Sequence, residues 1–186
     1  MQPQAGNRIS NAIAKASGAF AAILGFIALA GWILELPVLA SLGHGWIPMA
    51  PSSALLFVLL GTTVFFSTRV PPSRTARWTG VAFGSAVALI GLLLFFLSYL
   101  GIRLDAEHLG FAIAGTVDEA PIGYMSPATA LCFLVAGLSL VASLASTPDR
   151  PGPAIAGFWL AGLMLFASIV FLLAYQIGRV SCRERV

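Results

Sequence analysis

The chain has 186 residues, a length that suits one globular domain, but its composition does not suit a soluble one. Hydrophobic residues make up 59 % of the chain and charged residues only 9 %, whereas about a quarter of an ordinary soluble domain is charged. A soluble fold needs many more ionisable side chains to cover its surface, so this composition excludes an ordinary soluble protein. We expect the lipid bilayer to be the main partner, and we expect no nucleic acid.

The few charged residues are segregated and leave five long apolar stretches. A helix that crosses the roughly 30 Å hydrocarbon layer needs about 20 apolar residues. The stretches lack the polar alternation of membrane strands, and an open sheet cannot face lipid. We therefore predict an all-α, polytopic membrane helix bundle with five transmembrane helices, at about 18–36, 52–68, 79–100, 127–145 and 154–176.

The distribution of Lys and Arg predicts the orientation of these helices. The N-terminal segment 1–17 and the connections 67–78 and 146–153 lie on one side and carry six basic residues: Arg8, Lys15, Arg69, Arg74, Arg77 and Arg150. The loops 40–51 and 101–124 lie on the other side and carry only Arg103. Cytoplasmic loops have an excess of Lys and Arg, so residues 1–17 should be cytoplasmic and the acidic loop 101–124 extracytoplasmic.

An internal repeat is the most informative feature of the sequence. Residues 47–61 align without a gap on residues 123–137, at a constant offset of 76. The matched pairs are Met49 and Met125, Pro51 and Pro127, Ala54 and Ala130, Leu55 and Leu131, Phe57 and Phe133, and Gly61 and Gly137. In both copies the motif leaves an extracytoplasmic loop and begins a span. The repeat predicts a helix–loop–helix hairpin that is used at least twice.

The residue types of the motif suit the start of a packed helix. Proline is favoured at the first helical position, where its missing N–H is not needed, and Ser126 can cap the helix that Pro127 begins. Gly61 and Gly137 remove side-chain bulk where a neighbouring helix can approach. Other small-residue steps are Ala21 with Gly25, Gly80 with Gly84, and Gly157 with Ala161; helix packing explains them better than dimerisation does.

The candidate ligand residues lie near the extracytoplasmic ends of the spans. Glu35 ends the first span, and a solvated end explains it better than a ligand or proton site does. Trp32, Trp46 and Tyr99 suit an interfacial aromatic belt, with a pocket that stacks a small molecule as the alternative. We keep Trp32, Glu35, Trp46 and Tyr99 as candidate ligand residues at the outer face.

The sequence contains no arrangement that would support catalysis. His44 and His108 fall in the outer loops, and we interpret both as exposed histidines rather than pH sensors. The spacing of Cys132, Cys182 and the histidines does not match a metal site, and no nucleophile–base pair or phosphate-binding loop is evident. We therefore expect no enzyme, no cofactor and no metal.

The last ten residues do not fit the predicted topology. Five spans from a cytoplasmic start place residues 177–186 outside, yet Arg179, Arg183 and Arg185 give this segment the charge of a cytoplasmic one. The segment also closely resembles one reading frame of a common sequencing adapter. We interpret 177–186 as a non-native tail, 18–176 as a transmembrane domain, and the chain as a fragment; a translocated basic tail is the alternative.

The motif at Met125–Gly137 resembles the polytopic N-terminal sensor region of bacterial multidomain signalling proteins. These are sensor histidine kinases and GGDEF diguanylate cyclases, often with PAS domains. The end of the fifth span, Phe171–Gly178, is also similar to that group, although Ser53 replaces a threonine in the first motif copy. The resemblance implies a six-helix module in the bacterial cytoplasmic membrane, a homodimer formed through the full-length protein, and a missing cytoplasmic output domain.

The sequence thus favours a sensory input module that passes an extracytoplasmic or membrane-derived signal to that output domain. A small multi-helix carrier or channel is the rival hypothesis, because repeated hairpins also build transporters. The spans lack charges at their centres, and both repeats run in one orientation, which disfavours an inverted-repeat carrier. A structural membrane subunit is the third possibility.

Overall fold

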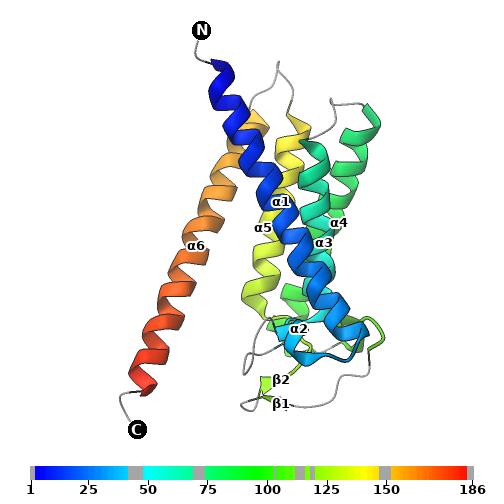
Figure 1. Ribbon diagram of the computed structural model, residues 1–186, viewed down its shortest axis with the longest axis vertical. Helices are drawn as coiled ribbons and strands as arrows, with labels where there is room; N and C mark the ends of the chain where they lie inside the picture. Colours follow the sequence, from blue (N-terminus) through cyan, green and yellow to red (C-terminus); the bar gives the residue numbers. More distant parts are fainter. Residues whose placement is uncertain are drawn as a thin grey trace.

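A computed structural model describes residues 3–41, 48–68, 74–102, 104–111, 116–117, 120–146 and 152–183. The long helices are α1 (Pro3–Ile33), α3 (Pro51–Ser67), α4 (Arg74–Tyr99), α5 (Pro127–Ala145) and α6 (Gly152–Arg183). The short elements are α2 (Pro37–Ser41), the 3-10 helix η1 (Asp105–His108), and the strands β1 (Thr116–Val117) and β2 (Ala120–Pro121). Figure 1 shows the arrangement. The predicted all-helical class is therefore correct, apart from the two-residue strands, which pair antiparallel.

Several helices have the length and composition of membrane spans. Within the described residues, three qualify: Ser10–Ile33, Arg74–Tyr99 and Pro127–Ala145. The apolar helices Pro51–Ser67 and Ile155–Val170 are shorter. Many large apolar side chains of α1, α4 and α6 are exposed, including Phe20, Leu93 and Phe158. In water such a surface would be unfavourable, so it supports insertion into a membrane.

The first span ends earlier than its predicted limit at residue 36. Helix α1 stops at Ile33, and Glu35 adopts a left-handed conformation with φ of 54°. Pro37 then begins α2. A residue before proline is disfavoured in the helical region, which explains why the helix breaks before Leu36 and restarts at the proline.

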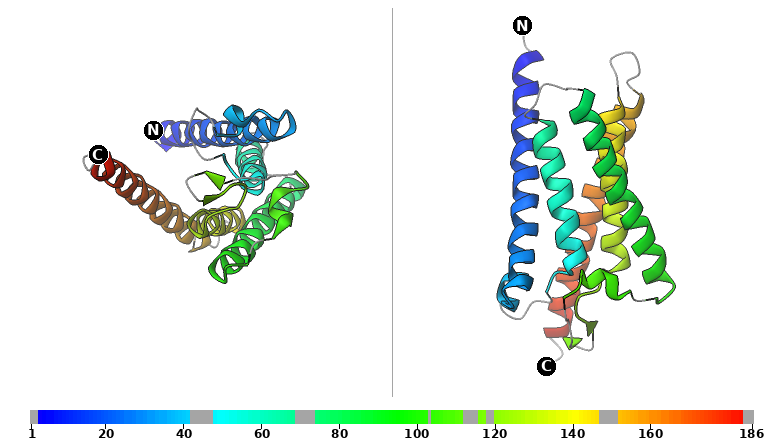
Figure 2. Two further views of the ribbon diagram at one scale, coloured as in Figure 1. Left: turned by 90° about the horizontal axis from the view of Figure 1, so that it is seen from below. Right: turned by 90° about the vertical axis from the view of Figure 1, so that its right-hand side faces the viewer.

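The body of the bundle consists of α1, α3, α4 and α5. Helix α6 extends away from this body (Figures 1 and 2). Helix α1 packs against α3, α3 against α4, and α4 against α5. Among the described elements, α6 packs only against α5. The connections containing α2, η1, β1 and β2 share one end of the bundle, here called the η1 end, and the N-terminus lies at the other (Figure 1).

The buried core lies between α3, α4 and the start of α5. It consists of Leu56, Val87, Leu94, Met125, Ala130 and Phe133. The ring of Phe57 meets that of Phe133 edge-on at 5.1 Å, so the two motif phenylalanines contact each other across the α3–α5 interface. Such a T-shaped pair adds to the stabilisation from buried area.

Glycines allow two helix pairs to approach until their backbones touch. A Cβ added at Gly61 of α3 would lie 2.5 Å from the N atom of Ala22 in α1. A Cβ added at Gly137 of α5 would lie 2.7 Å from the N atom of Ala88 in α4. The close approach expected at both glycines is therefore present, and it serves packing within the chain.

Candidate functional site

The most unusual polar residues lie in η1, which folds back against the bundle. Glu107 is only 6 % exposed and His108 only 8 %. The segment is tightly turned: the N–H of Glu107 donates to the carbonyl of Leu104, and Leu109 takes a left-handed conformation with φ of 52°. A buried carboxylate needs a compensating partner, so the contacts of Glu107 define the site.

Glu107 is hydrogen-bonded to the start of α5. The backbone N–H of Met125 donates to Oε2 of Glu107 at 2.9 Å. Burial raises the pKa of the Glu107 carboxyl above its ordinary value, while the Met125 N–H and the charge of His108 oppose this rise. Two residues further on, Pro127 begins α5, and Ser126 caps it by accepting the N–H of Thr129 at 3.1 Å. One carboxyl group thus connects η1 to the first turn of a long helix.

His108 is buried, so its interpretation as an exposed loop histidine is wrong. Its ring lies 4.6 Å from that of Tyr124, with an interplanar angle of 54°. The Nε2 atom is buried and has no hydrogen-bond partner in the part of the chain that the structure describes. The acidic loop that we predicted to be extracytoplasmic therefore contains a buried carboxyl and a buried imidazole.

The candidate ligand residues do not gather into one site. Trp32 is partly buried; its Nε1–H donates to the carbonyl of Met49 at 2.8 Å, and its ring lies 6.4 Å from that of Phe111. Tyr99 is 77 % exposed and stacks on Phe95 of its own helix. Glu35 is exposed in its turn. Trp46 and His44 lie outside the described residues.

The two motif copies hold their first residues through different polar contacts. The N–H of Met49 donates to the carbonyl of Ala40 at 2.9 Å. The carbonyl of Met49 accepts the Nε1–H of Trp32. Met125 is held by Glu107 instead. The other motif residues occupy matching roles, since Pro51 and Pro127 begin their helices, Ala54 and Ala130 are fully buried, and Leu55 and Leu131 are less buried.

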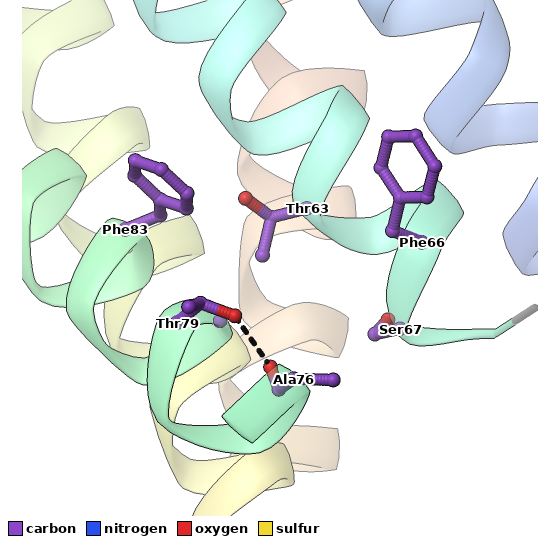
Figure 3. A pocket seen from close by; sticks show the side chains of 7 residues that line it. Thr63, Phe66, Ser67, Ala76, Thr79 and Phe83 are labelled. Atoms are coloured by element: carbon purple, nitrogen blue, oxygen red, sulfur yellow. Dashed lines mark hydrogen bonds between the residues drawn. The ribbon is translucent and has the colours of Figure 1, made fainter. Parts of the chain in front are cut away.

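Two cavities flank α3 at its opposite ends. The first lies at the η1 end, between α3, α4 and η1, and has a volume of about 200 Å³. The second, at the other end between α3 and α4, is equally large and is shown in Figure 3. Its hydroxyl groups bond to their own helices: Thr63 to Leu59, and Thr79 to Ala76. The second cavity therefore presents no unpaired hydroxyl to a ligand.

A basic surface lies at the end opposite η1. Arg74, Arg77 and Trp78 line a depression of about 330 Å³ together with Val81 and Ala145. Arg77 Nη2 donates to the carbonyl of Ala145 at 2.8 Å, and a cation at the C-terminus of a helix is favoured by the helix dipole. The last turn of α5 is thus attached to α4, just as its first turn is attached to η1.

The residues described do not include a group of three or more potential metal ligands. Fold and site together define a helical protein with membrane-type spans and a buried carboxyl–imidazole pair at one end. Comparison with protein-family models, curated proteins and solved structures gives no match.

The burial of Glu107 and His108 was not predicted from the sequence. The apolar neighbours Leu104 and Leu109 were a signal that this short acidic segment has a buried side.

Proposed function

We propose that the chain is a membrane-embedded sensory input module built from two related helical hairpins, α1–α3 and α4–α5. The observation that carries the sensory function is the Glu107–Met125 hydrogen bond. It joins a segment at one end of the bundle to a helix that extends to the other end. A sensor needs such a connection, because a stimulus must bias an element that has two arrangements.

The glycine contacts support the two-hairpin organisation. In the first hairpin Gly61 meets Gly18 and Ala22, and Gly25 meets Ala54. In the second hairpin Gly137 meets Gly84 and Ala88, and Gly91 meets Ala130. The first helices correspond at an offset of 66 residues (84 minus 18) and the second helices at 76 (137 minus 61). One pattern of contacts, repeated at two fixed offsets, is expected from a duplicated unit.

The difference between these offsets supports a special role for η1. The connection within the second hairpin is ten residues longer than that within the first (76 minus 66). That connection contains Glu107 and His108, and long connections in compact proteins commonly serve a function. The second hairpin is therefore the one with the sensing segment.

Helix α5 is suited to carry a change across the membrane. Its 19 residues span about 28 Å at 1.5 Å per residue, close to the hydrocarbon thickness. Glu107 contacts the residue before its cap, and Arg77 holds its last carbonyl. A change in the protonation or position of Glu107 would shift the first turn, and a helix transmits such a shift as a rigid body.

The topology belongs to the same proposal: five spans, a cytoplasmic N-terminus, the bacterial cytoplasmic membrane, and an output domain and homodimer contacts outside residues 18–176. Helix α3, with 17 residues, is about 26 Å long, so it would span with a small mismatch. The rival carrier has less support. The buried titratable side chains of the described residues, Glu107 and His108, lie at the η1 end rather than along the long helices.

The test compares two amide substitutions in the same short helix. Glu107→Gln imitates the protonated carboxyl, and Asp105→Asn is the matched control because Asp105 is exposed. Spin labels at Thr75 and Ala145, both exposed, report the α4–α5 distance at the far end, in protein reconstituted in nanodiscs and lacking both cysteines. We expect Glu107→Gln to alter the distance distribution and Asp105→Asn to leave it unchanged. Identical distributions for all three proteins would refute the sensory proposal.

A further inference from the structure

The cavity at the η1 end has apolar walls and two polar groups. Seven leucine or isoleucine side chains and one alanine line it: Leu55, Leu56, Ile90, Leu93, Leu94, Leu104, Ala106 and Leu109. The polar residues are Ser52 in the first turn of α3 and Glu107 in η1. A concave apolar site with a few polar groups is the usual form of a small-molecule site.

Ser52 is the second, independent observation. It is 7 % exposed, and its Oγ is buried without a hydrogen-bond partner in the described residues. Helical hydroxyls of this chain commonly donate to a carbonyl one turn earlier, as Thr62 does to Val58 and Ser143 to Ser139. Ser52 is the second residue of α3, so the carbonyl four residues earlier belongs to Pro48, before the helix. Its hydroxyl therefore lacks an acceptor one turn earlier in its own helix, and an unmade hydrogen bond inside a protein is unfavourable.

The volume limits the size of the ligand. A cavity of about 150 Å³ lined by leucine, isoleucine and phenylalanine holds benzene. Scaling by volume from six carbon atoms, a cavity of about 200 Å³ takes about eight non-hydrogen atoms. Drug-sized ligands need about 300 Å³ or more, so this cavity would not enclose one. Leu93 and Leu109 are partly exposed at the rim, which leaves a path from the bilayer.

We propose that this cavity binds a medium-chain alcohol, with the alkyl chain between α3 and α4 and the hydroxyl bonded to Ser52 Oγ. A charged head would be unfavourable among apolar walls, and a carboxylate would also face Glu107. A lipid acyl chain would fill the space but would leave Ser52 without a partner. The inference deepens the proposed function, because the alcohol would be a stimulus adjacent to Glu107.

Photolabelling tests the proposal directly on the full chain in nanodiscs. The probe is octan-1-ol carrying a diazirine. It has more non-hydrogen atoms than the cavity encloses, so the end of its chain would project past the exposed rim at Leu93 and Leu109. Mass spectrometry locates the label. We expect saturable labelling of residues 52–56, 90–94 and 104–109, reduced by excess octan-1-ol. Labelling that rises linearly with the probe, or that octan-1-ol does not reduce, would mean that lipid fills the cavity and would overturn the proposal.

Variants distinguish the contribution of the Ser52 hydroxyl to binding from that of the cavity's volume. Ser52→Ala should weaken the binding of octan-1-ol about two- to tenfold, the range expected for one neutral hydrogen bond. The substitution should not change how strongly 1-fluorooctane competes with the probe. Ser53→Ala is the control, because Ser53 is also buried but does not line the cavity. Leu93→Trp should fill the cavity and abolish saturable labelling. Equal affinities for octan-1-ol in the wild type and Ser52→Ala would overturn the role of Ser52.

The failure of this inference can be distinguished from the failure of the proposed function. If labelling is saturable but Glu107→Gln does not change the α4–α5 distance, the alcohol site is supported and the sensory role is refuted. If Glu107→Gln changes that distance but labelling is not saturable, the sensory role is supported and the alcohol site is refuted.

Discussion

The carboxyl group of Glu107 accepts the backbone N–H of Met125 at 2.9 Å, eighteen residues further along the chain. This single contact ties the 3-10 helix η1 to the start of α5. Both residues are buried, at 6 % and 4 % exposure. A buried carboxyl that holds a helix start links the protonation of one side chain to the position of that helix.

Stability should therefore depend on pH through Glu107. Because burial raises its pKa above 4.5, the folded protein binds this proton more tightly than the unfolded chain does. The free energy of unfolding should then fall as pH rises from 4.5 to the raised value, and stay constant above it. Thermal unfolding in detergent measures this slope.

Glu107→Gln should flatten that slope, and Asp105→Asn should not. His108 lies next to Glu107, and Tyr124 packs on His108, whereas α3 and the first turn of α5 contain no titratable side chain. An unchanged slope in Glu107→Gln would assign the pH dependence to another group.

The backbone contact at Gly137 predicts a large effect from one methyl group. In Gly137→Ala the new Cβ would lie 2.7 Å from both the N atom of Ala88 and the carbonyl oxygen of Gly84. Backbone atoms cannot move aside as a side chain can, so α4 and α5 must separate. We expect a loss of about 1–3 kcal/mol, seen as a lower midpoint of thermal unfolding.

Gly162→Ala is the matched control, because an added Cβ there meets nothing within 4 Å. Alanine favours a helix over glycine by up to about 1 kcal/mol, so this variant should be as stable as the wild type or more stable. Equal losses in both variants would mean that helix contact is not the cause.

The sequence predicted the helical class and the Pro127 helix start because both depend on local patterns. The length of an apolar run identifies a membrane span, and the preference for proline at the first helical position depends only on neighbouring residues. The burial of Glu107 and His108 depends instead on η1 folding back onto α3, a contact between segments far apart in the chain. A short run with charged residues has no periodicity that would reveal which side chains turn inward. The interpretation of His108 as exposed was therefore wrong.

The unpaired Nε2 of His108 gives a further prediction. The imidazole packs on Tyr124 at 4.6 Å, but its buried nitrogen has no partner in the described residues. His108→Phe keeps a flat ring on Tyr124 and removes a desolvated polar atom, whose burial costs about 1–3 kcal/mol. The variant should be as stable as the wild type or more stable in thermal unfolding. A clear loss would show that Nε2 has a partner in solution, and His108→Gln should then recover part of it.

The charge distribution predicts which connections face outward. Six basic residues on one side against one on the other should place position 73 in the cytoplasm and position 115 outside. Single cysteines replace Ser73 or Gly115 in a chain whose Cys132 and Cys182 are changed to serine. A membrane-impermeant maleimide should label position 115 in intact cells, and position 73 only after permeabilisation. Labelling of position 73 in intact cells would reverse the topology, and η1 with Glu107 would then face the cytoplasm, where it could not sense an external signal.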